Sequence, residues 1–280
     1  MIDAQLLVPD ETYDEFRNLW EARVALYAGI LARHGVRLEA ARWTAARADW
    51  PALACMTWGY HLLAAEWDAF LSRWPGDVPI ANPASVLRWN TDKGYLAELE
   101  RTGLATVPTR FVGRADAAAL AEARAAFGAD ELVVKPRVSG GAWRTERLGP
   151  GDPAPDLPEA MVQPFLPAVS GEGELSAFLI GGEYSHAMRK VAKPGDFRVQ
   201  REHGGAFTPF EADAEMLATA RAAVAAAPAP PAYARCDLIR LGDGRLAVME
   251  LEMIEPDLYL DLVPAAEDRF GAAVAGALRG

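Results

Sequence analysis

The chain has 280 residues, 51% hydrophobic and 24% charged, a composition typical of a globular protein with two or three lobes. Its 39 acidic and 28 basic residues give a net charge of −11, which argues against sequence-independent nucleic-acid binding. The two cysteines, Cys55 and Cys236, give neither a disulfide framework nor a metal-ligand pattern. Because no signal-peptide pattern and no apolar run of about 20 residues is present, we expect a cytoplasmic protein without a membrane span.

Residues 1–82 are predicted to form a small α/β lobe. Strands are expected at residues 4–8, 36–41 and 53–60, and helices at residues 10–33 and 64–74, the first with apolar residues spaced by threes and fours. The third strand is expected to end in an aromatic loop that carries Trp58, Tyr60 and His61. A lone histidine beside aromatic residues is either structural or a substrate contact, and the sequence does not decide between the two.

The next part of the chain carries two lysines and a glycine-rich turn. Residues 83–101 are expected to form one helix containing Lys93, and residues 131–136 a strand containing Lys135. The strand runs into Ser139-Gly140-Gly141. Such a turn is either a phosphate cradle or a simple hairpin turn. Because no helix is expected to follow, it is neither a P-loop nor a dinucleotide-binding fingerprint.

A β-hairpin is predicted between residues 174 and 190. If the glycine pair at 181–182 forms its loop, Glu174 lies opposite Arg189. A basic, glycine-bearing segment follows at residues 194–205. Helices are expected at residues 211–227 and 265–278.

The strongest hairpin signal is the Asp-Gly pair at 243–244, which stands between two alternating apolar runs. A two-residue loop there places Asp237 opposite Glu250 and Arg235 opposite Glu252, all four on one face. The opposite face is expected to point into the core and carries Cys236, Leu238, Met249, Leu251 and Met253.

Three carboxylates within cross-strand contact repel one another unless they are protonated, paired or bridged by a cation. Arg235 alone cannot neutralise all three. An all-oxygen cluster of this kind suits Mg²⁺ that arrives with substrate phosphates. The alternative is a solvated hairpin face with an ordinary Arg235–Glu252 ion pair.

Together, these pieces resemble the ATP-grasp superfamily of carboxylate–amine ligases. The motifs occur in the same order as in that family: a lysine, a strand lysine, a glycine-rich loop, a hinge, a basic segment and an acidic metal hairpin. Residues 133–136 (VVKP), 163–166 (QPFL), 195–198 (GDFR) and 249–256 (MELEMIEP) look like the glutathione-synthetase branch.

A narrower resemblance is to the subgroup that contains O-ureido-D-serine cyclo-ligase of D-cycloserine biosynthesis. Residues 57–61 (TWGYH), 82–83 (NP), 88–93 (RWNTDK) and 197–200 (FRVQ) carry it. Two positions depart from the pattern. Gly59 stands where the subgroup often has an acidic residue, and Glu252 stands where family members often have asparagine.

The resemblance implies an α/β ATP-grasp fold. It comprises an N-terminal pre-ATP-grasp lobe (residues 1–82), and a central lobe (83–160) and a C-terminal lobe (161–280) that clasp ATP. The implied site residues are Lys93 and Lys135 at the phosphates, Ser139, Gly140 and Gly141 over the triphosphate, Gln163, Phe165 and Leu166 around adenine, Glu174 at the ribose, Asp237, Glu250 and Glu252 at two Mg²⁺ ions, and Arg235, Arg198 and Arg189 at the reacting groups.

The resemblance also implies a reaction. A small-molecule carboxylate attacks the γ-phosphate of ATP, and an amine then displaces phosphate from the acylphosphate, within one molecule or between two. A homodimer is compatible with this expectation. Two alternatives remain on the same fold: a non-catalytic nucleotide-binding regulatory protein, and a small-molecule kinase that stops at phosphate transfer.

Overall fold

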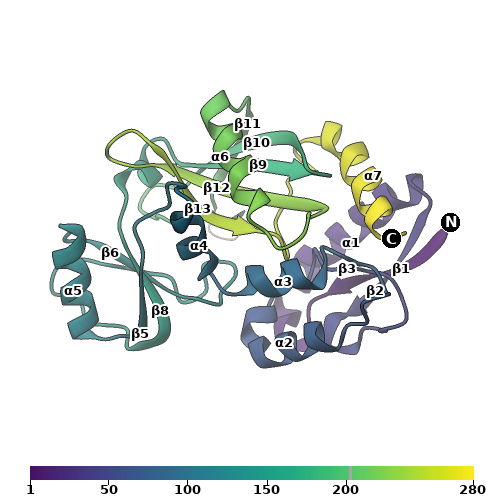
Figure 1. Ribbon diagram of the computed structural model, residues 1–280, viewed down its shortest axis with the longest axis horizontal. Helices are drawn as coiled ribbons and strands as arrows, with labels where there is room; N and C mark the ends of the chain where they lie inside the picture. The colour runs from purple at the N-terminus through teal and green to yellow at the C-terminus, as the bar shows by residue number, and fades with distance from the viewer. Residues whose placement is uncertain (202–203) are drawn as a thin grey trace.

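The computed structural model describes residues 1–201 and 204–280, and the side chains of residues 14–19 are not described. The described chain forms three β-sheets with helices packed on them (Figure 1). This confirms the predicted mixed α/β fold class. His203, in the segment predicted at 194–205, lies outside the described residues. Within the described ranges, no helix is long and apolar enough to cross a membrane.

The N-terminal sheet is parallel, with strand order β2-β1-β3-β4. Leu6, Leu7 and Val8 are all buried, as expected for a parallel strand covered on both faces. The strand predicted at residues 53–60 is wrong, because the chain turns after two residues and leads into a short 3-10 helix, η3 (Tyr60–Leu63). The other elements are β1 (Ile2–Val8), β2 (Val36–Arg42), β3 (Ala52–Leu53), β4 (Ile80–Ala81), the 3-10 helices η1 (Glu11–Phe16) and η2 (Trp43–Ala45), α1 (Arg17–Arg33) and α2 (Ala64–Arg73).

The central sheet is antiparallel, with order β5-β8-β6-β7, and α5 packs on it. Asp116 caps α5 by accepting a hydrogen bond from the backbone of Ala119 at 2.9 Å. Gly128 ends α5 in the left-handed conformation that glycine adopts freely. The elements are β5 (Arg110–Ala115), α5 (Ala117–Phe127), β6 (Leu132–Pro136), β7 (Glu146–Leu148) and β8 (Leu157–Pro164).

The C-terminal sheet is also antiparallel, with order β11-β10-β9-β12-β13, and α6 packs on one of its faces. The strand β11 was not predicted from the sequence. The elements are η4 (Pro167–Ser170), β9 (Glu174–Ile180), β10 (Glu183–Val191), β11 (Ala206–Phe210), α6 (Ala214–Ala225), β12 (Tyr233–Arg240), β13 (Leu246–Glu252), η6 (Pro264–Ala266) and α7 (Glu267–Ala277).

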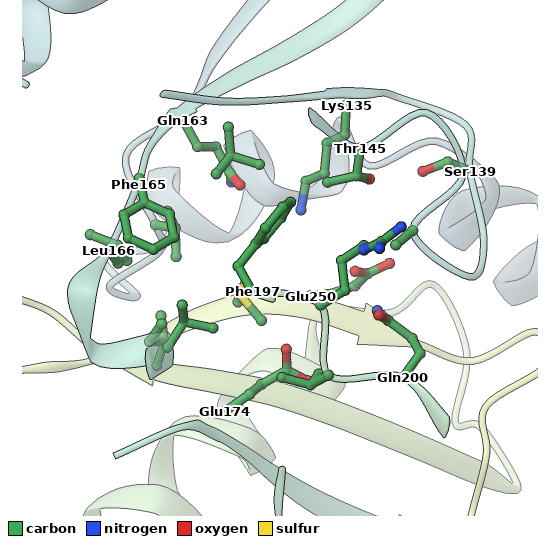
Figure 2. A pocket seen from close by; sticks show the side chains of 18 of the residues that line it. Lys135, Ser139, Thr145, Gln163, Phe165, Leu166, Glu174, Phe197, Gln200 and Glu250 are labelled. Carbon is green, nitrogen blue, oxygen red and sulfur yellow. The ribbon is translucent and has the colours of Figure 1, made fainter. Parts of the chain in front are cut away.

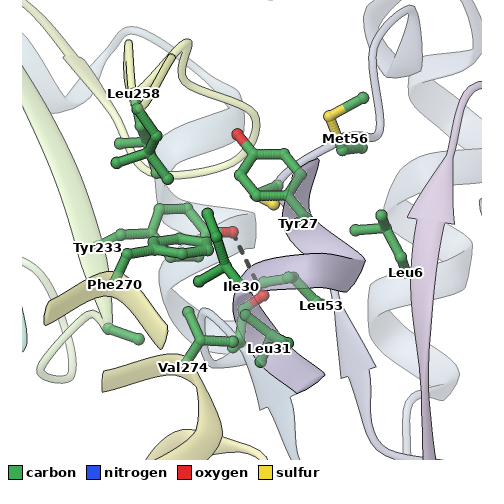
Figure 3. Packing of buried hydrophobic residues seen from close by; sticks show 14 of the residues in the cluster. Leu6, Tyr27, Ile30, Leu31, Leu53, Met56, Tyr233, Leu258, Phe270 and Val274 are labelled. Atoms are coloured by element: carbon green, nitrogen blue, oxygen red, sulfur yellow. Dashed lines mark hydrogen bonds between the residues drawn. The ribbon is translucent and has the colours of Figure 1, made fainter. Parts of the chain in front are cut away.

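A shared core joins the N-terminal lobe to the C-terminal sheet. Figure 3 shows Tyr27 and Leu31 of α1 facing Phe270 of α7 and Tyr233 of β12. The rings of Tyr27 and Phe270 are 5.3 Å apart, and all four side chains are almost fully buried. Each buried side chain of this size contributes about 1.5–3 kcal/mol. The core therefore fixes the first lobe against the strand that carries Arg235.

The helix predicted at residues 83–101 is two helices, α3 (Ala84–Thr91) and α4 (Tyr95–Arg101). The break occurs because Asp92 adopts an extended conformation and the Lys93 N–H donates to Arg137 O at 3.0 Å instead of continuing the helix. Both helices pack against the core of the C-terminal sheet (Figure 1). The break directs Lys93 into the space between the central and C-terminal sheets.

Side chains from the first part of the chain bind the free edge of β13. Asn90 donates to Leu251 O at 2.9 Å and accepts from Met253 N at 2.7 Å. Tyr95 Oη accepts from Leu251 N at 2.9 Å and donates to its carbonyl at 3.0 Å. Since β13 is an edge strand, these bonds satisfy backbone groups that no further strand pairs. They also fix the backbone on both sides of Glu252.

Candidate active site

A cleft lies between the central and C-terminal sheets, and the empty space in it, including open solvent at its mouth, is about 920 Å³. Figure 2 shows Phe165 and Leu166 at one end and Ser139 at the other, with Lys135 above and Glu250 below. The cleft brings together twelve of the fifteen predicted site residues, namely Lys93, Lys135, Ser139, Gly140, Gly141, Gln163, Phe165, Leu166, Glu174, Arg198, Glu250 and Glu252. The other three, Asp237, Arg235 and Arg189, do not line it.

The acidic hairpin has the predicted pairing at the site. Asp237 lies opposite Glu250, and Arg235 opposite Glu252. The predicted two-residue loop is wrong, because the turn spans residues 241–245 and Met249 forms a β-bulge. The bulge compensates for the longer turn and restores the pairing. It also places Met249 in the wall of the cleft, although the sequence predicted it in the core.

Asp237 is buried beneath the cleft among positive charges. Its Oδ1 accepts from Ser176 Oγ at 2.5 Å and from Lys190 Nζ at 3.0 Å, and its Oδ2 accepts from Arg235 at 2.9 Å. Burial alone would raise the pKa of Asp237, but Arg235 and Lys190 outweigh burial and lower it. Asp237 is therefore an ionised carboxylate whose oxygens are already hydrogen-bonded.

Glu250 and Glu252 reach the cleft, with side chains 23% and 28% exposed. Glu250 lies 3.2 Å from Lys93 Nζ. Burial opposes ionisation of Glu250, but Lys93 and Lys135 lower its pKa. Burial, together with repulsion from Glu250 and Asp237, raises the pKa of Glu252 to about 7, although Glu252 also accepts a hydrogen bond from Arg235. The two acids thus share one face but titrate differently.

The two lysines stand beside the glycine-rich turn. Lys93 Nζ donates to Ser139 O at 2.6 Å and lies 3.2 Å from its Oγ. Lys135 is buried, and burial, with repulsion from Lys93, lowers its pKa. Gly141 has φ +57, a left-handed conformation that favours glycine. Two compact cations and an open backbone turn at one end of a cleft can bind an anion such as a phosphate chain.

The hinge segment forms the opposite end of the cleft. The Phe165 N–H donates to Glu131 O at 2.9 Å, and Gln163 Nε2 donates to Thr109 Oγ1 at 2.8 Å, which fix the segment to the central lobe. The guanidinium of Arg147 lies 3.6 Å from the centre of the Phe165 ring. Phe197, which was not predicted, packs edge-on to Phe165 at 6.4 Å. An apolar pocket with a few polar groups suits a planar base.

The predicted register of the second hairpin is wrong. Ser185 forms a bulge in β10, so Lys190 rather than Arg189 lies opposite Glu174. Lys190 forms ion pairs with both Glu174 and Asp237. Arg189 points away from the cleft and donates to Gly171 O at 3.1 Å. Lys190 is thus the charged residue that the sequence analysis missed, because no sequence pattern marked the bulge.

Among the described residues, no group of three or more acidic, histidine or cysteine side chains is arranged to hold a metal ion. Each predicted ligand is instead bonded to a cation: Asp237 to Lys190 and Arg235, Glu252 to Arg235, and Glu250 to Lys93.

Comparison with known proteins gives the family. No protein-family model matches the sequence. The chain is 30% identical to cycloserine biosynthesis protein DcsG of Streptomyces lavendulae over 279 aligned residues, which cover 88% of this chain and 90% of that protein. The crystal structure of D-cycloserine synthetase DcsG matches with a TM-score of 0.83 and 25% identity, over 99% of both chains. The protein belongs to the ATP-grasp carbon–nitrogen ligases, which confirms the predicted family, fold and class of enzyme.

Two further matches extend this result. Glutathione synthetase from Prochlorococcus marinus is 33% identical over 154 residues, which cover 51% of this chain and 46% of that protein. The structure of ATP-grasp ligase PsnB complexed with minimal precursor, Mg and ADP has a TM-score of 0.66 at 16% identity, and covers 98% of this chain and 97% of that one. Enzymes of this family use ATP, and Mg accompanies the nucleotide in the PsnB complex.

Proposed function

We propose that the protein uses Mg-ATP to activate the carboxylate of a small amino acid as an acylphosphate and joins it to an amine. The observation that carries this proposal is the meeting of Lys93, Lys135 and Glu250 at the glycine-rich end of one cleft. Two cations there bind phosphate oxygens, and a carboxylate facing them provides an oxygen for the metal ion that accompanies ATP.

The nucleotide lies along the cleft in this proposal. Phe165 and Leu166 enclose adenine, Lys93 and Lys135 bind the phosphates, and the backbone of Gly140 and Gly141 closes over them. Glu174 lines the cleft between these two ends but is paired with Lys190. Glu174 therefore accepts a ribose hydroxyl with an oxygen that does not bind Lys190.

Magnesium requires oxygen ligands and usually keeps several waters while it binds one or two carboxylates and the substrate phosphates. Glu250 and Glu252 fit this requirement because both carboxylates face the cleft. Asp237 fits less well, because its two oxygens accept from Ser176, Lys190 and Arg235. We assign Glu250 and Glu252 as ligands, with Asp237 orienting Arg235 beneath them. When bound, the metal neutralises charge that develops on the transferred phosphoryl group.

The reaction proceeds in two displacements. A carboxylate oxygen of the substrate attacks the γ-phosphorus, and the bond to the bridging oxygen breaks to release ADP. The amine nitrogen then attacks the acyl carbon, the carbon–oxygen bond breaks, and inorganic phosphate leaves as the nitrogen loses a proton. Arg198, which lines the C-terminal side of the cleft, stabilises the negative charge of the acylphosphate. Arg235 lies beneath the cleft and orients Glu252, to which it donates a hydrogen bond.

For the substrate, the likeness to DcsG favours an amino acid that cyclises, and O-ureido-D-serine is the compound to test. One local difference separates this chain from the subgroup pattern. A Cβ placed on Gly59 would lie 2.7 Å from the Tyr13 ring, so that ring occupies the space an acidic side chain would need. A contact between the substrate and an acidic side chain at this position is therefore not part of the proposal.

The experiment is an ADP-release assay with Mg-ATP, O-ureido-D-serine and hydroxylamine, which traps an acylphosphate as a hydroxamate. The proposal predicts hydroxamate in proportion to ADP, and none with Glu250→Gln. Stable phosphorylated substrate without hydroxamate would instead identify a kinase. Tight ATP binding without ADP release, with this compound and with a pool of amino acids, would identify a regulatory nucleotide-binding protein.

A further inference from the structure

The segment that follows β10 brings four consecutive residues, 197–200, to the cleft without helix or strand structure. Figure 2 shows Phe197 and Gln200 of this segment among the residues that line the cleft. The hydrogen bonds that residues 192–200 make to described residues are all local in sequence. Val199 packs in a small apolar cluster and holds the middle of the segment. A segment with so few bonds to the rest of the fold needs a further contact to keep its side chains in place.

The position of Arg198 depends on this segment as a whole. Its Nε donates to Asp196 Oδ1 at 3.1 Å, and its Nη2 donates to Asp196 Oδ2 at 3.0 Å. Because Asp196 belongs to the same segment, this pair orients the guanidinium only relative to the segment. Phe197 reaches Phe165 of the hinge from the same place, with 6.4 Å between the rings. Whatever fixes the segment therefore also places an arginine and an aromatic ring at the cleft.

Arg201 connects the segment to a distant part of the chain. Its Nε donates to Asp257 Oδ2 at 2.8 Å, and its Nη1 and Nη2 donate to the two carboxylate oxygens of Asp261 at 3.0 and 2.9 Å. The guanidinium also lies 4.8 Å from the centre of the Tyr259 ring and 5.3 Å from that of Phe207. A planar fork of donors that pairs with two carboxylates beside aromatic rings requires arginine rather than lysine.

The carboxylate of Asp257 is itself fixed. Arg23 of α1 donates to both of its oxygens, at 2.7 and 2.8 Å. Burial alone would raise the pKa of Asp257, but Arg23 and Arg201 outweigh burial and lower it, so the group is ionised. The Tyr259 N–H donates to Asp257 Oδ1 at 2.9 Å, and Tyr259 has φ +49, a conformation that persists only where surrounding contacts impose it. Arg201 thus binds a rigid anchor that α1 of the first lobe helps to hold.

We infer that Arg201 is a positioning residue of the active site, because its bonds to Asp257 and Asp261 hold Phe197 and Arg198 at the cleft. Arg201 does not line the cleft itself. The inference rests on the proposed function for the role of Arg198 toward the acylphosphate. Its other part, which concerns Phe197, requires only that a nucleotide binds in the cleft. The two parts are therefore tested separately.

The nucleotide part is tested by calorimetry with Mg²⁺ and a non-hydrolysable ATP analogue. We expect Arg201→Met to raise the Kd about fivefold, but to raise it less than about twofold in a Phe197→Ala background, where the contact is already lost. Arg201→Lys keeps the charge without the fork and should give an intermediate Kd. The matched control is Arg37→Met, which removes an exposed forked pair with Asp3 and should leave the Kd within about twofold.

The catalytic part is tested by hydroxamate formation with the amino acid that supports ADP release. We expect Arg201→Met to lower kcat/KM about tenfold in the wild-type background and less than about twofold in an Arg198→Ala background. A residue that acts only on the stability of the fold would lower kcat/KM by the same factor in both backgrounds. Arg37→Met should again leave the wild-type value unchanged.

Asp261→Asn provides a second variant in case Arg201→Met does not fold, and it should change both measurements in the same direction. Wild-type values of the Kd and of kcat/KM in both variants would overturn the inference. So would equal losses with and without Phe197 and Arg198. If no amino acid supports ADP release while the nucleotide measurements behave as expected, the proposed function is contradicted and the positioning role of Arg201 is supported.

Discussion

Lys190 Nζ lies 3.0 Å from Asp237 Oδ1, although β9 separates their strands. The same ammonium pairs with Glu174, so one buried lysine neutralises two carboxylates under the cleft. Asp237 is held in turn by Arg235. The floor of the site is therefore a network of buried ion pairs in which each member depends on the others.

Replacement of Lys190 should destabilise the fold. Lys190→Met leaves Glu174 and Asp237 buried without this cation, and loss of one partner from a buried pair costs roughly 3–5 kcal/mol. Urea denaturation should show the loss as a lower midpoint. Lys193→Met, at an exposed position, should change the midpoint little. Equal midpoints for the two variants would contradict the network.

The two arginines that the sequence analysis grouped together should behave differently. Arg198 lines the cleft, whereas Arg189 donates to backbone carbonyls outside it. Steady-state kinetics should therefore show kcat/KM reduced about tenfold or more in Arg198→Ala and nearly unchanged in Arg189→Ala. A larger effect at Arg189 would show that the cleft is not the catalytic site.

Lys135 should contribute to nucleotide affinity. It is a buried cation that faces the cleft beside Lys93, and a charge-assisted bond to phosphate is among the stronger polar contacts. We expect Lys135→Ala to raise the Kd for Mg-ATP about tenfold or more by calorimetry. Lys193→Ala is the matched control. Unchanged affinity in Lys135→Ala would remove the phosphate role.

Stability should depend on pH through His186, a residue outside the cleft. Burial lowers the pKa of His186 to about 4, and its ring stacks on Phe178 and donates through Nε2 to Leu258 O at 3.0 Å. Because the unfolded chain binds this proton near pH 6.5, the unfolded state holds more protons than the folded state between pH 6.5 and 4. The contribution of neutral His186 to the free energy of unfolding is therefore fully present above pH 6.5 and decreases as the pH falls towards 4.

Protonation of His186 should lower the free energy of unfolding by roughly 3 kcal/mol between pH 6.5 and pH 4. His186→Gln keeps a hydrogen-bond donor but does not titrate, so its free energy of unfolding should vary less over this range. Parallel pH profiles for the wild-type protein and the variant would show that His186 is not buried in its neutral form.

The acidic hairpin shows which features of the site could be predicted from the sequence. Alternation and the Asp-Gly turn correctly placed Asp237 opposite Glu250, even though the turn is longer than predicted. The pairing survived because the Met249 bulge lies between the turn and the site. Resemblance, together with this pairing, gave the family and most of the residues that line the cleft.

Features without a local sequence signal were missed. The Ser185 bulge changed the residue opposite Glu174 from Arg189 to Lys190, and nothing in the alternation of that strand marks it. The break between α3 and α4 depends on the bond from Lys93 N to Arg137 O, a contact between segments distant in the sequence. Tertiary contacts of this kind override local helix propensity.

The proposed function requires that this cleft make an acylphosphate from ATP and an amino-acid carboxylate. The most direct measurement is mass spectrometry of nucleotides and products after incubation with Mg-ATP and pooled amino acids that include O-ureido-D-serine, with Glu250→Gln as the control. We expect ADP, inorganic phosphate and a new dehydrated product, whose mass is that of the joined groups less one water, all absent with Glu250→Gln. Formation of AMP and pyrophosphate would contradict it.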